Sequence, residues 1–217
     1  MTAIALSRLH FPVTTLGPGR RIGIWLQGCS IQCPGCISAD TWNTTEGLTT
    51  TDSVIEALRD WLPYAEGITI SGGEPFDQPD ALSILLQELR GLTAVDVLVY
   101  SGYPLSALTD WLQNNPGLID ALITEPYDAT AEQTLLLRGS DNQRLHFVSQ
   151  LGRDRFSSFE RPLRSTDRRL DVMFDHDGTV WLAGIPGKDD FHRLRKLLKA
   201  AGHTAGFSDS HSTEVSS

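Results

Sequence analysis

The residues of this chain with the clearest chemistry are three cysteines that fall within eight positions: Cys29, Cys33 and Cys36. Thiolates are soft ligands, and a group of them selects zinc, copper(I) or an iron–sulfur centre. A structural zinc site usually has four protein ligands, but the chain has no fourth cysteine and no histidine soon after the motif. A [4Fe–4S] cluster on three thiolates leaves one iron free to bind a substrate or cofactor. The C-x3-C-x2-C spacing therefore predicts an iron–sulfur site, with a three-ligand zinc site and three incidental thiols as the alternatives.

The composition limits the classes of partner. The 217 residues are 40% apolar and 21% charged, which suits one compact core. With 27 acidic and 18 basic side chains the net charge is −9, and such a surface repels a phosphate backbone. No apolar run approaches the ~20 residues of a membrane span, and the first residues lack the regions of a secretory signal. We therefore expect a cytoplasmic protein without a nucleic-acid or membrane partner.

Short apolar strands alternate with amphipathic helices along most of the chain. The expected strands cover residues 22–26, 67–70, 95–100, 119–124 and 145–148. The expected helices begin with a capping box at Ser53 and with Pro79, which precedes a stop at Gly91, and a third helix passes through Trp111. This alternation is typical of an α/β fold, in which helices cover a parallel sheet.

The same pattern places three unusual segments at one edge of the sheet. The cysteine loop, the 71–75 turn (Ser-Gly-Gly-Glu-Pro) and the 100–103 turn (Tyr-Ser-Gly-Tyr) each follow a strand. Ligands of such sheets bind at the carboxyl ends of the strands. We therefore expect the three segments to form one site.

The regular alternation ends near residue 150, and we divide the chain there. Residues 1–150 form the expected core domain with the cluster loop, and 151–169 form an arginine-rich linker. Residues 170–202 are expected to form a small extension, a β-hairpin with an Asp-Gly turn and an amphipathic helix, and 203–217 a disordered tail. The apolar side chains that this extension is expected to bury include Val172, Val180, Trp181 and Leu197.

The cysteine loop and the 71–75 turn together resemble the radical S-adenosylmethionine (SAM) superfamily. Over about residues 17–148 the chain is similar to the activating enzymes of glycyl-radical enzymes, such as the activase of anaerobic ribonucleotide reductase. The segments that carry this resemblance are 26–29, 33–36, 41–42, 100–103 and 138–144. Leu137 stands where this family usually has tryptophan, and the segment 124–128 lacks the usual Asp-Gly pair. These departures do not change the expected cluster chemistry, but they leave the identity of the partner protein undecided.

The resemblance implies a fold, a cofactor pair and a reaction. The fold would be the partial, open β/α barrel of the superfamily with a mostly parallel sheet, plus the C-terminal extension. Cys29, Cys33 and Cys36 would be the catalytic and metal-ligating residues of the [4Fe–4S] cluster, whose open iron binds SAM. One electron from the cluster would cleave SAM to methionine and a 5′-deoxyadenosyl radical, which takes a hydrogen atom from the substrate. The residues expected to contact SAM are Gly35, Cys36, Ile37, Gly72, Gly73, Glu74, Ser101 and Tyr103.

The resemblance also implies two protein partners: a glycyl-radical-type protein substrate and a one-electron donor such as flavodoxin or ferredoxin. A radical SAM enzyme for a small molecule or a peptide is the runner-up, which the absence of cysteines for further clusters disfavours. A non-catalytic iron–sulfur or zinc module is the alternative from another class. The 138–144 segment is expected to bind a carboxylate or a partner peptide, with a solvated loop as its alternative. A bulky side chain at Gly73 is expected to block SAM and to leave the cluster in place.

Overall fold

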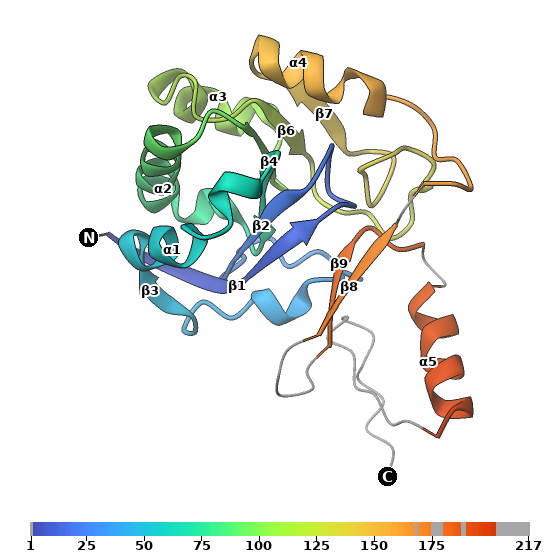
Figure 1. Cartoon of the computed structure of the whole chain (residues 1–217). Coiled ribbons are helices and arrows are strands. Elements are labelled where there is room, and N and C mark those ends of the chain that lie inside the picture. The colour runs from blue at the N-terminus through green and yellow to red at the C-terminus, as the bar shows by residue number, and fades with distance from the viewer. Residues whose placement is uncertain (1, 168, 175–179, 188–189, 203–217) are drawn as a thin grey trace.

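The structure, a computed structural model, describes residues 2–167, 169–174, 180–187 and 190–202 (Figure 1). Its main element is a seven-stranded sheet in the order β3-β1-β2-β4-β5-β6-β7. The strands are β1 (Ala3–Val13), β2 (Arg21–Leu26), β3 (Leu48–Thr50), β4 (Gly67–Gly72), β5 (Asp96–Tyr100), β6 (Ala121–Thr124) and β7 (Arg144–Phe147). The central strands β2, β4, β5 and β6 are parallel, while β1, β3 and β7 run antiparallel to their neighbours. The predicted α/β class is confirmed, with a sheet that is mixed at its edges.

Two of these strands are not predicted by the apolar pattern. Most side chains of β1 are half-buried, and its sequence mixes arginine, histidine and proline with apolar residues, so it lacks a clear alternation. The three-residue strand β3 has no buried side chain. Both strands form because β1 pairs with β2 on one side and with β3 on the other. Pairing within the sheet, rather than local pattern, therefore decides their structure.

The helices are α1 (Thr51–Leu58), α2 (Pro79–Leu92), α3 (Leu105–Asn114), α4 (Gln150–Phe156) and α5 (Asp190–Ala200). Helices α1, α2 and α3 cover one face of the sheet and share its larger hydrophobic core (Figure 1). Two predicted helix boundaries are wrong. Helix α1 is capped by Thr50, whose hydroxyl accepts a hydrogen bond from the backbone N–H of Ser53 at 3.2 Å. Helix α2 continues through Gly91 to Leu92, since the backbone of Gly91 has no positive φ that would end it.

Helix α4 packs on the other face of the sheet. Its last residue, Phe156, is fully buried against Leu98, Ala121 and Ile123 of β5 and β6. The structure thus differs from the linker expected over residues 151–169, because the first part of that range belongs to the core. The sequence does not predict this helix, because a run of arginines suggests exposed chain. One of these arginines instead has a charged partner inside the protein.

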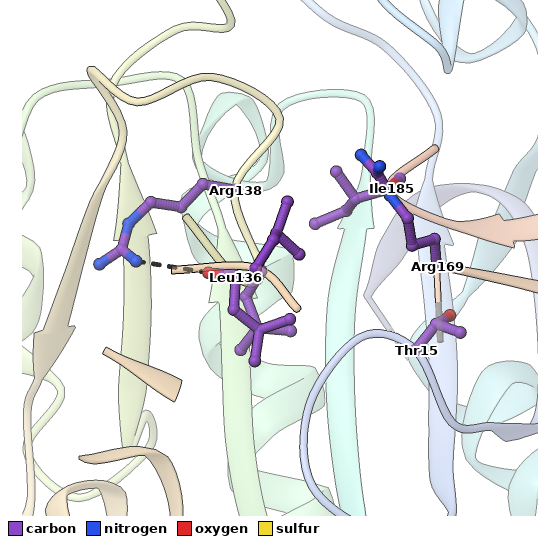
Figure 2. Close-up of a pocket in the computed structure, with 7 residues that line it drawn as sticks. Thr15, Leu136, Arg138, Arg169 and Ile185 are labelled. Carbon is purple, nitrogen blue, oxygen red and sulfur yellow. Dashed lines mark hydrogen bonds between the residues drawn. The ribbon is translucent and has the colours of Figure 1, made fainter. Parts of the chain in front are cut away.

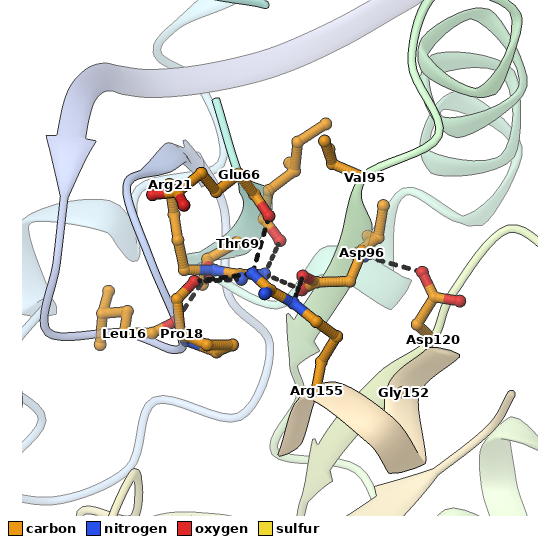
Figure 3. Close-up of polar contacts among 12 residues, drawn as sticks. Leu16, Pro18, Arg21, Glu66, Thr69, Val95, Asp96, Asp120, Gly152 and Arg155 are labelled. Atoms are coloured by element: carbon orange, nitrogen blue, oxygen red, sulfur yellow. Dashed lines mark hydrogen bonds and ion pairs between the residues drawn. The ribbon is translucent and has the colours of Figure 1, made fainter. Parts of the chain in front are cut away.

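That partner belongs to a buried ion network at the amino ends of the strands (Figure 3). The fully buried side chains of Arg21 and Asp96 lie 2.6 Å apart, and Arg155 Nε donates to the other Asp96 oxygen at 2.8 Å. Arg21 also donates to Thr69 Oγ1 at 2.6 Å. Gly67 leaves room for this arginine, because a Cβ at that position would lie 2.1 Å from Arg21 Nη1. The network joins β2, β4, β5 and α4 at the end of the sheet opposite the cysteine loop.

The C-terminal extension contains the predicted hairpin strands, β8 (Leu170–Phe174) and β9 (Val180–Gly184), paired antiparallel. The predicted turn at 175–178, the helix start at 188 and the tail from 203 lie outside the described residues. One face of the hairpin packs on the main sheet, where Ala183 is buried against Val13, Leu16 and Trp25. The extension is therefore docked on the core.

The outer face of the hairpin differs from expectation. Val172 and Val180 are 52% and 50% exposed, and Leu197 on α5 is 67% exposed. Successive strand residues point to opposite faces, so docking through one face leaves these valines outside, and α5 has no buried side chain. No helix among the described residues combines the length and apolar character needed to cross a bilayer.

Candidate functional site

The cysteine loop begins where β2 ends and is closed by hydrogen bonds to its own far end. The backbone N–H of Gly28 donates to Thr41 O at 2.7 Å, and that of Cys29 donates to Trp42 O at 3.3 Å. Between these points the backbone turns sharply, with φ of +93° at Gly28, +79° at Gly35 and +50° at Gln32. Glycine adopts such angles without strain. The loop thus holds its three free, half-buried cysteines at the carboxyl end of β2.

The surroundings of the three thiols favour the neutral form of each in the metal-free chain, because burial is the largest influence on their pKa values. Burial raises the pKa of each thiol, and nearby backbone N–H groups lower it. These N–H groups belong to Ile31 and Gln32 beside Cys29, to Tyr127 beside Cys33 and to Ser38 beside Cys36. Charge on Cys29 also raises the pKa of Cys33, and charge on either of these sulfurs raises that of Cys36. A metal cluster that neutralises this charge would fit the donor set.

The indole N–H of Trp42 also fits a metal cluster at the three cysteines. Nε1 of Trp42 is buried without an acceptor at hydrogen-bond geometry, although a buried donor normally has one. It lies close to Cys36, where it lowers the pKa of the thiol. A thiolate held by a cluster at Cys36 would supply the missing acceptor.

Zinc and a [4Fe–4S] cluster place different demands on three thiolates. Within the described ranges, no group of three or more His, Cys, Asp or Glu side chains is placed to hold one metal ion. Zinc needs its thiolates about 2.3 Å from one centre. In a [4Fe–4S] cluster each thiolate binds a different iron, so the sulfurs need not converge on one point.

The Gly72–Gly73 turn packs directly against the start of the cysteine loop. The backbone N–H of Gly73 donates to Leu26 O at 2.8 Å, and that of Glu74 donates to Gly28 O at 2.8 Å. A Cβ at position 73 would lie 1.9 Å from Gly28 O, and one at position 72 would lie 2.5 Å from Leu26 O. Both glycines are therefore required by the contact between two strand ends, whatever else approaches them.

Glu74 joins the 71–75 turn to the turn after β5. Its carboxylate is almost fully buried and accepts hydrogen bonds from Ser101 Oγ and the N–H groups of Phe76 and Gly102, at 2.8, 3.0 and 2.8 Å. Burial raises the pKa of Glu74 to about 7, while these three donors act to lower it. Both carboxylate oxygens thus accept hydrogen bonds within the protein, and the side chain holds the two turns together.

A second polar group connects all three segments near the surface. Asp77 accepts hydrogen bonds from the backbone N–H and the hydroxyl of Ser30, at 2.7 and 2.9 Å, and from Tyr103 Oη at 2.7 Å. Ser30 follows Cys29 directly, so this group holds the first turn of the cysteine loop. Sequence reasoning missed Asp77, for which the only signal is its place three residues after Glu74.

The cysteine loop, the 71–75 turn and the turn after β5 thus meet at one sheet edge. Gly35 and Ile37 lie on either side of Cys36 in the loop and are half-buried. A fourth loop also reaches the cysteines, since the backbone N–H of Tyr127 faces Cys33. This loop is strained at Glu125, where φ is +80°. The departure from the family pattern at 124–128 therefore lies next to the cluster site.

The 138–144 segment is occupied by contacts inside the protein. Arg138 is 2% exposed, and its Nη2 donates to both carboxylate oxygens of Glu160, at 2.6 and 2.7 Å. Gln143 accepts from the backbone N–H of Gly139 at 2.8 Å. Arg138 also borders a narrow pocket between the core and the extension, which includes Thr15, Arg169 and Ile185 (Figure 2). The guanidinium of Arg138 is thus paired with a carboxylate of this chain, while binding of a partner peptide by the 138–144 segment stays a prediction.

Comparison with known proteins agrees with this site. A family described as a 4Fe-4S single cluster domain matches residues 15–146. The anaerobic ribonucleoside-triphosphate reductase-activating protein of Escherichia coli (strain K12) is 31% identical over 148 residues, which cover 64% of this chain and 96% of the relative. Proteins with the same name from Vibrio cholerae and Enterobacteria phage T4 are 32% and 29% identical, over 63% and 59% of this chain and 94% and 85% of their own lengths.

The matched residues contain the cysteine loop and every strand-end turn described above. The relatives are matched over nearly their whole length, while about a third of this chain has no counterpart in them. The chain belongs to the family of anaerobic ribonucleoside-triphosphate reductase-activating proteins, which are radical SAM activating enzymes with a 4Fe–4S domain.

Proposed function

We propose that this protein uses a [4Fe–4S] cluster on Cys29, Cys33 and Cys36 to cleave SAM reductively and to install a glycyl radical on a partner enzyme. When bound, the reduced cluster supplies the electron that breaks the C5′–S bond of SAM, giving methionine and the radical that abstracts hydrogen from a glycine Cα. The observation that carries the proposal is the meeting of the cysteine loop with the 71–75 turn, where Glu74 N–H donates to Gly28 O. The parallel order of β2, β4, β5 and β6 supports the open β/α barrel of this superfamily.

The residues around the cysteines have separate tasks in this proposal. The three thiolates would hold the cluster, and the backbone of Gly35, Cys36 and Ile37 would contact the adenine part of SAM. The Gly72–Gly73 turn would offer main-chain groups to the methionine amine of SAM, because neither residue has a side chain in the way. Glu74 and Ser101 hold that turn against the next strand end, as their mutual hydrogen bond indicates. Tyr103, held by its hydrogen bond to Asp77, would contribute a further contact to SAM.

The cluster assignment is tested by metal content. Anaerobically reconstituted protein is expected to bind about four irons and an equal amount of sulfide. Replacing any one of Cys29, Cys33 and Cys36 with alanine is expected to abolish cluster binding. Stoichiometric zinc in an active protein would contradict the assignment.

The activase role rests on the names of the relatives, which describe proteins that activate anaerobic ribonucleoside-triphosphate reductase. We infer that the substrate of this chain is a glycine of such a reductase and that a flavodoxin or ferredoxin supplies the electron. The test incubates reduced protein, SAM and an anaerobic reductase, and then measures the organic radical of the reductase by electron paramagnetic resonance. A radical that appears only with all three components supports the role. SAM cleavage without any radical on the reductase would favour a small molecule or a peptide as substrate.

A further inference from the structure

The extension contacts the core through an arginine that lies between two tryptophans. The guanidinium carbon of Arg8, on β1, lies 5.0 Å from the ring centre of Trp181 on β9 and 5.4 Å from that of Trp25 on β2. Both distances are within the range of a cation–π interaction. Arg8 Nη1 also forms an ion pair with Asp40, whose side chain is 25% exposed. Arg8 is thus held by aromatic rings and by one carboxylate, all supplied by different segments.

Asp40 belongs to the far end of the cysteine loop, four residues after Cys36. A short helical turn covers Ala39–Thr41, and the carbonyl of Thr41 accepts the hydrogen bond from Gly28 N–H that closes the loop. Gln27 Nε2 adds a contact to Asp40 O at 3.3 Å. The position of Asp40 is therefore coupled to both ends of the cysteine loop.

Trp181 is held in place independently of Arg8. On the neighbouring strand, Asp171 accepts four hydrogen bonds, from the backbone N–H and the hydroxyl of both Thr14 and Thr15, at 2.6 to 3.1 Å. Thr15 Oγ1 also donates to Ala183 O at 3.1 Å. Asp171 and Ala183 are register partners, so both hairpin strands are attached to the turn that follows β1.

From these contacts we propose that the C-terminal hairpin braces the cluster loop: Trp181 fixes Arg8, and Arg8 fixes Asp40 and with it the far end of the loop. The inference rests on the proposed cluster at Cys29, Cys33 and Cys36, and it gives the segment beyond the family match a task in cluster retention. The family match ends at residue 146, so the hairpin lies outside it. Trp181 and Arg8 are positioning residues, because neither is placed against the thiols.

The test measures how fast a ferrous-iron chelator removes iron from the anaerobically reconstituted full chain without SAM. Trp181→Leu is expected to release iron about tenfold faster than the wild type, a factor that corresponds to about 1.4 kcal/mol. Trp181→Phe keeps an aromatic face over Arg8 and is expected to stay near the wild-type rate. Val180→Ala is the matched control, because Val180 is the neighbouring residue on the exposed face of the same strand.

A second variant separates bracing from simple unfolding of the hairpin. Asp40→Asn breaks the ion pair with Arg8 and leaves every contact of the hairpin with Thr14 and Thr15 intact, and it is expected to release iron faster as well. Wild-type release rates in both Trp181→Leu and Asp40→Asn would overturn the proposal. Retention of the full cluster by Cys29→Ala would instead overturn the proposed ligands, so the two failures are distinguishable.

Discussion

The hydroxyl of Ser101 donates a 2.8 Å hydrogen bond to Glu74 Oε1 and so ties the turn after β5 to the turn after β4. Glu74 N–H in turn donates to Gly28 O, one residue before the first cysteine. Three strand ends are thus connected through one glutamate. Because the carboxylate is buried, this connection depends on the protonation of a single group.

Glu74 is expected to make the stability of the protein depend on pH. Burial raises the pKa of Glu74 from 4.5 to about 7, so ionisation of this group costs more in the folded chain than in the unfolded chain. Its favourable contribution is complete below pH 4.5 and is lost as the pH rises to about 7, by about 3 kcal/mol in the free energy of unfolding. Denaturant unfolding of the apoprotein between pH 4.5 and 8 measures this change.

Glu74→Gln isolates the effect, because glutamine does not titrate in this range. The difference in unfolding free energy between the wild type and Glu74→Gln is expected to fall across the same pH window. A difference that stays constant with pH would show that Glu74 is ionised throughout and that its three hydrogen-bond donors outweigh its burial.

Gly73→Ala is expected to disturb the cysteine loop itself. The added Cβ would lie 1.9 Å from Gly28 O, so two strand ends must separate, at a cost of about 3 kcal/mol in the free energy of unfolding. Iron binding after reconstitution is expected to fall with it. Gly91→Ala is the control, because a Cβ there has no neighbour within 4 Å. Full iron binding by Gly73→Ala with loss of SAM cleavage alone would contradict this prediction and support a direct SAM contact.

Trp42→Phe is expected to lower the reduction potential of the cluster. The indole N–H of Trp42 is buried beside Cys36, and hydrogen bonds to cluster ligands favour the reduced, more negative state. Loss of a bond worth about 1 kcal/mol corresponds to about 40 mV for one electron. A redox titration followed by electron paramagnetic resonance measures the shift, with Trp61→Phe, on a different part of the chain, as the control. An unchanged reduction potential in Trp42→Phe would show that this N–H does not hydrogen-bond to a ligand of the cluster.

The cysteines and the glycine turn were predictable because their signals are local. Thiol spacing alone suggests a cluster, and strand pattern alone places the 71–75 turn at the carboxyl end of β4. The partners of these residues are not local. Ser30 and Asp77 are 47 positions apart, and neither residue type predicts the contact between them.

The arginines show more clearly that contacts between distant residues cannot be predicted from the sequence. In the sequence, Arg138 belongs to a segment expected to bind a carboxylate or a partner peptide, and Arg155 belongs to the expected linker. In the fold, Arg138 binds Glu160 and Arg155 binds Asp96. A sequence does not reveal which cations are neutralised inside a protein, because that depends on carboxylates brought close by the fold. Likewise, the sequence suggests that Gly73 leaves room for SAM, whereas the structure shows that Gly73 is packed against the cysteine loop.

The most direct test of the central claim is the fate of SAM. Reduced, anaerobically reconstituted protein is incubated with SAM, and methionine and 5′-deoxyadenosine are quantified. The proposed cluster chemistry predicts equal amounts of both products from the wild type and neither product from Cys29→Ala, Cys33→Ala or Cys36→Ala. A folded wild-type protein that carries about four irons, accepts an electron and still forms no 5′-deoxyadenosine would contradict it.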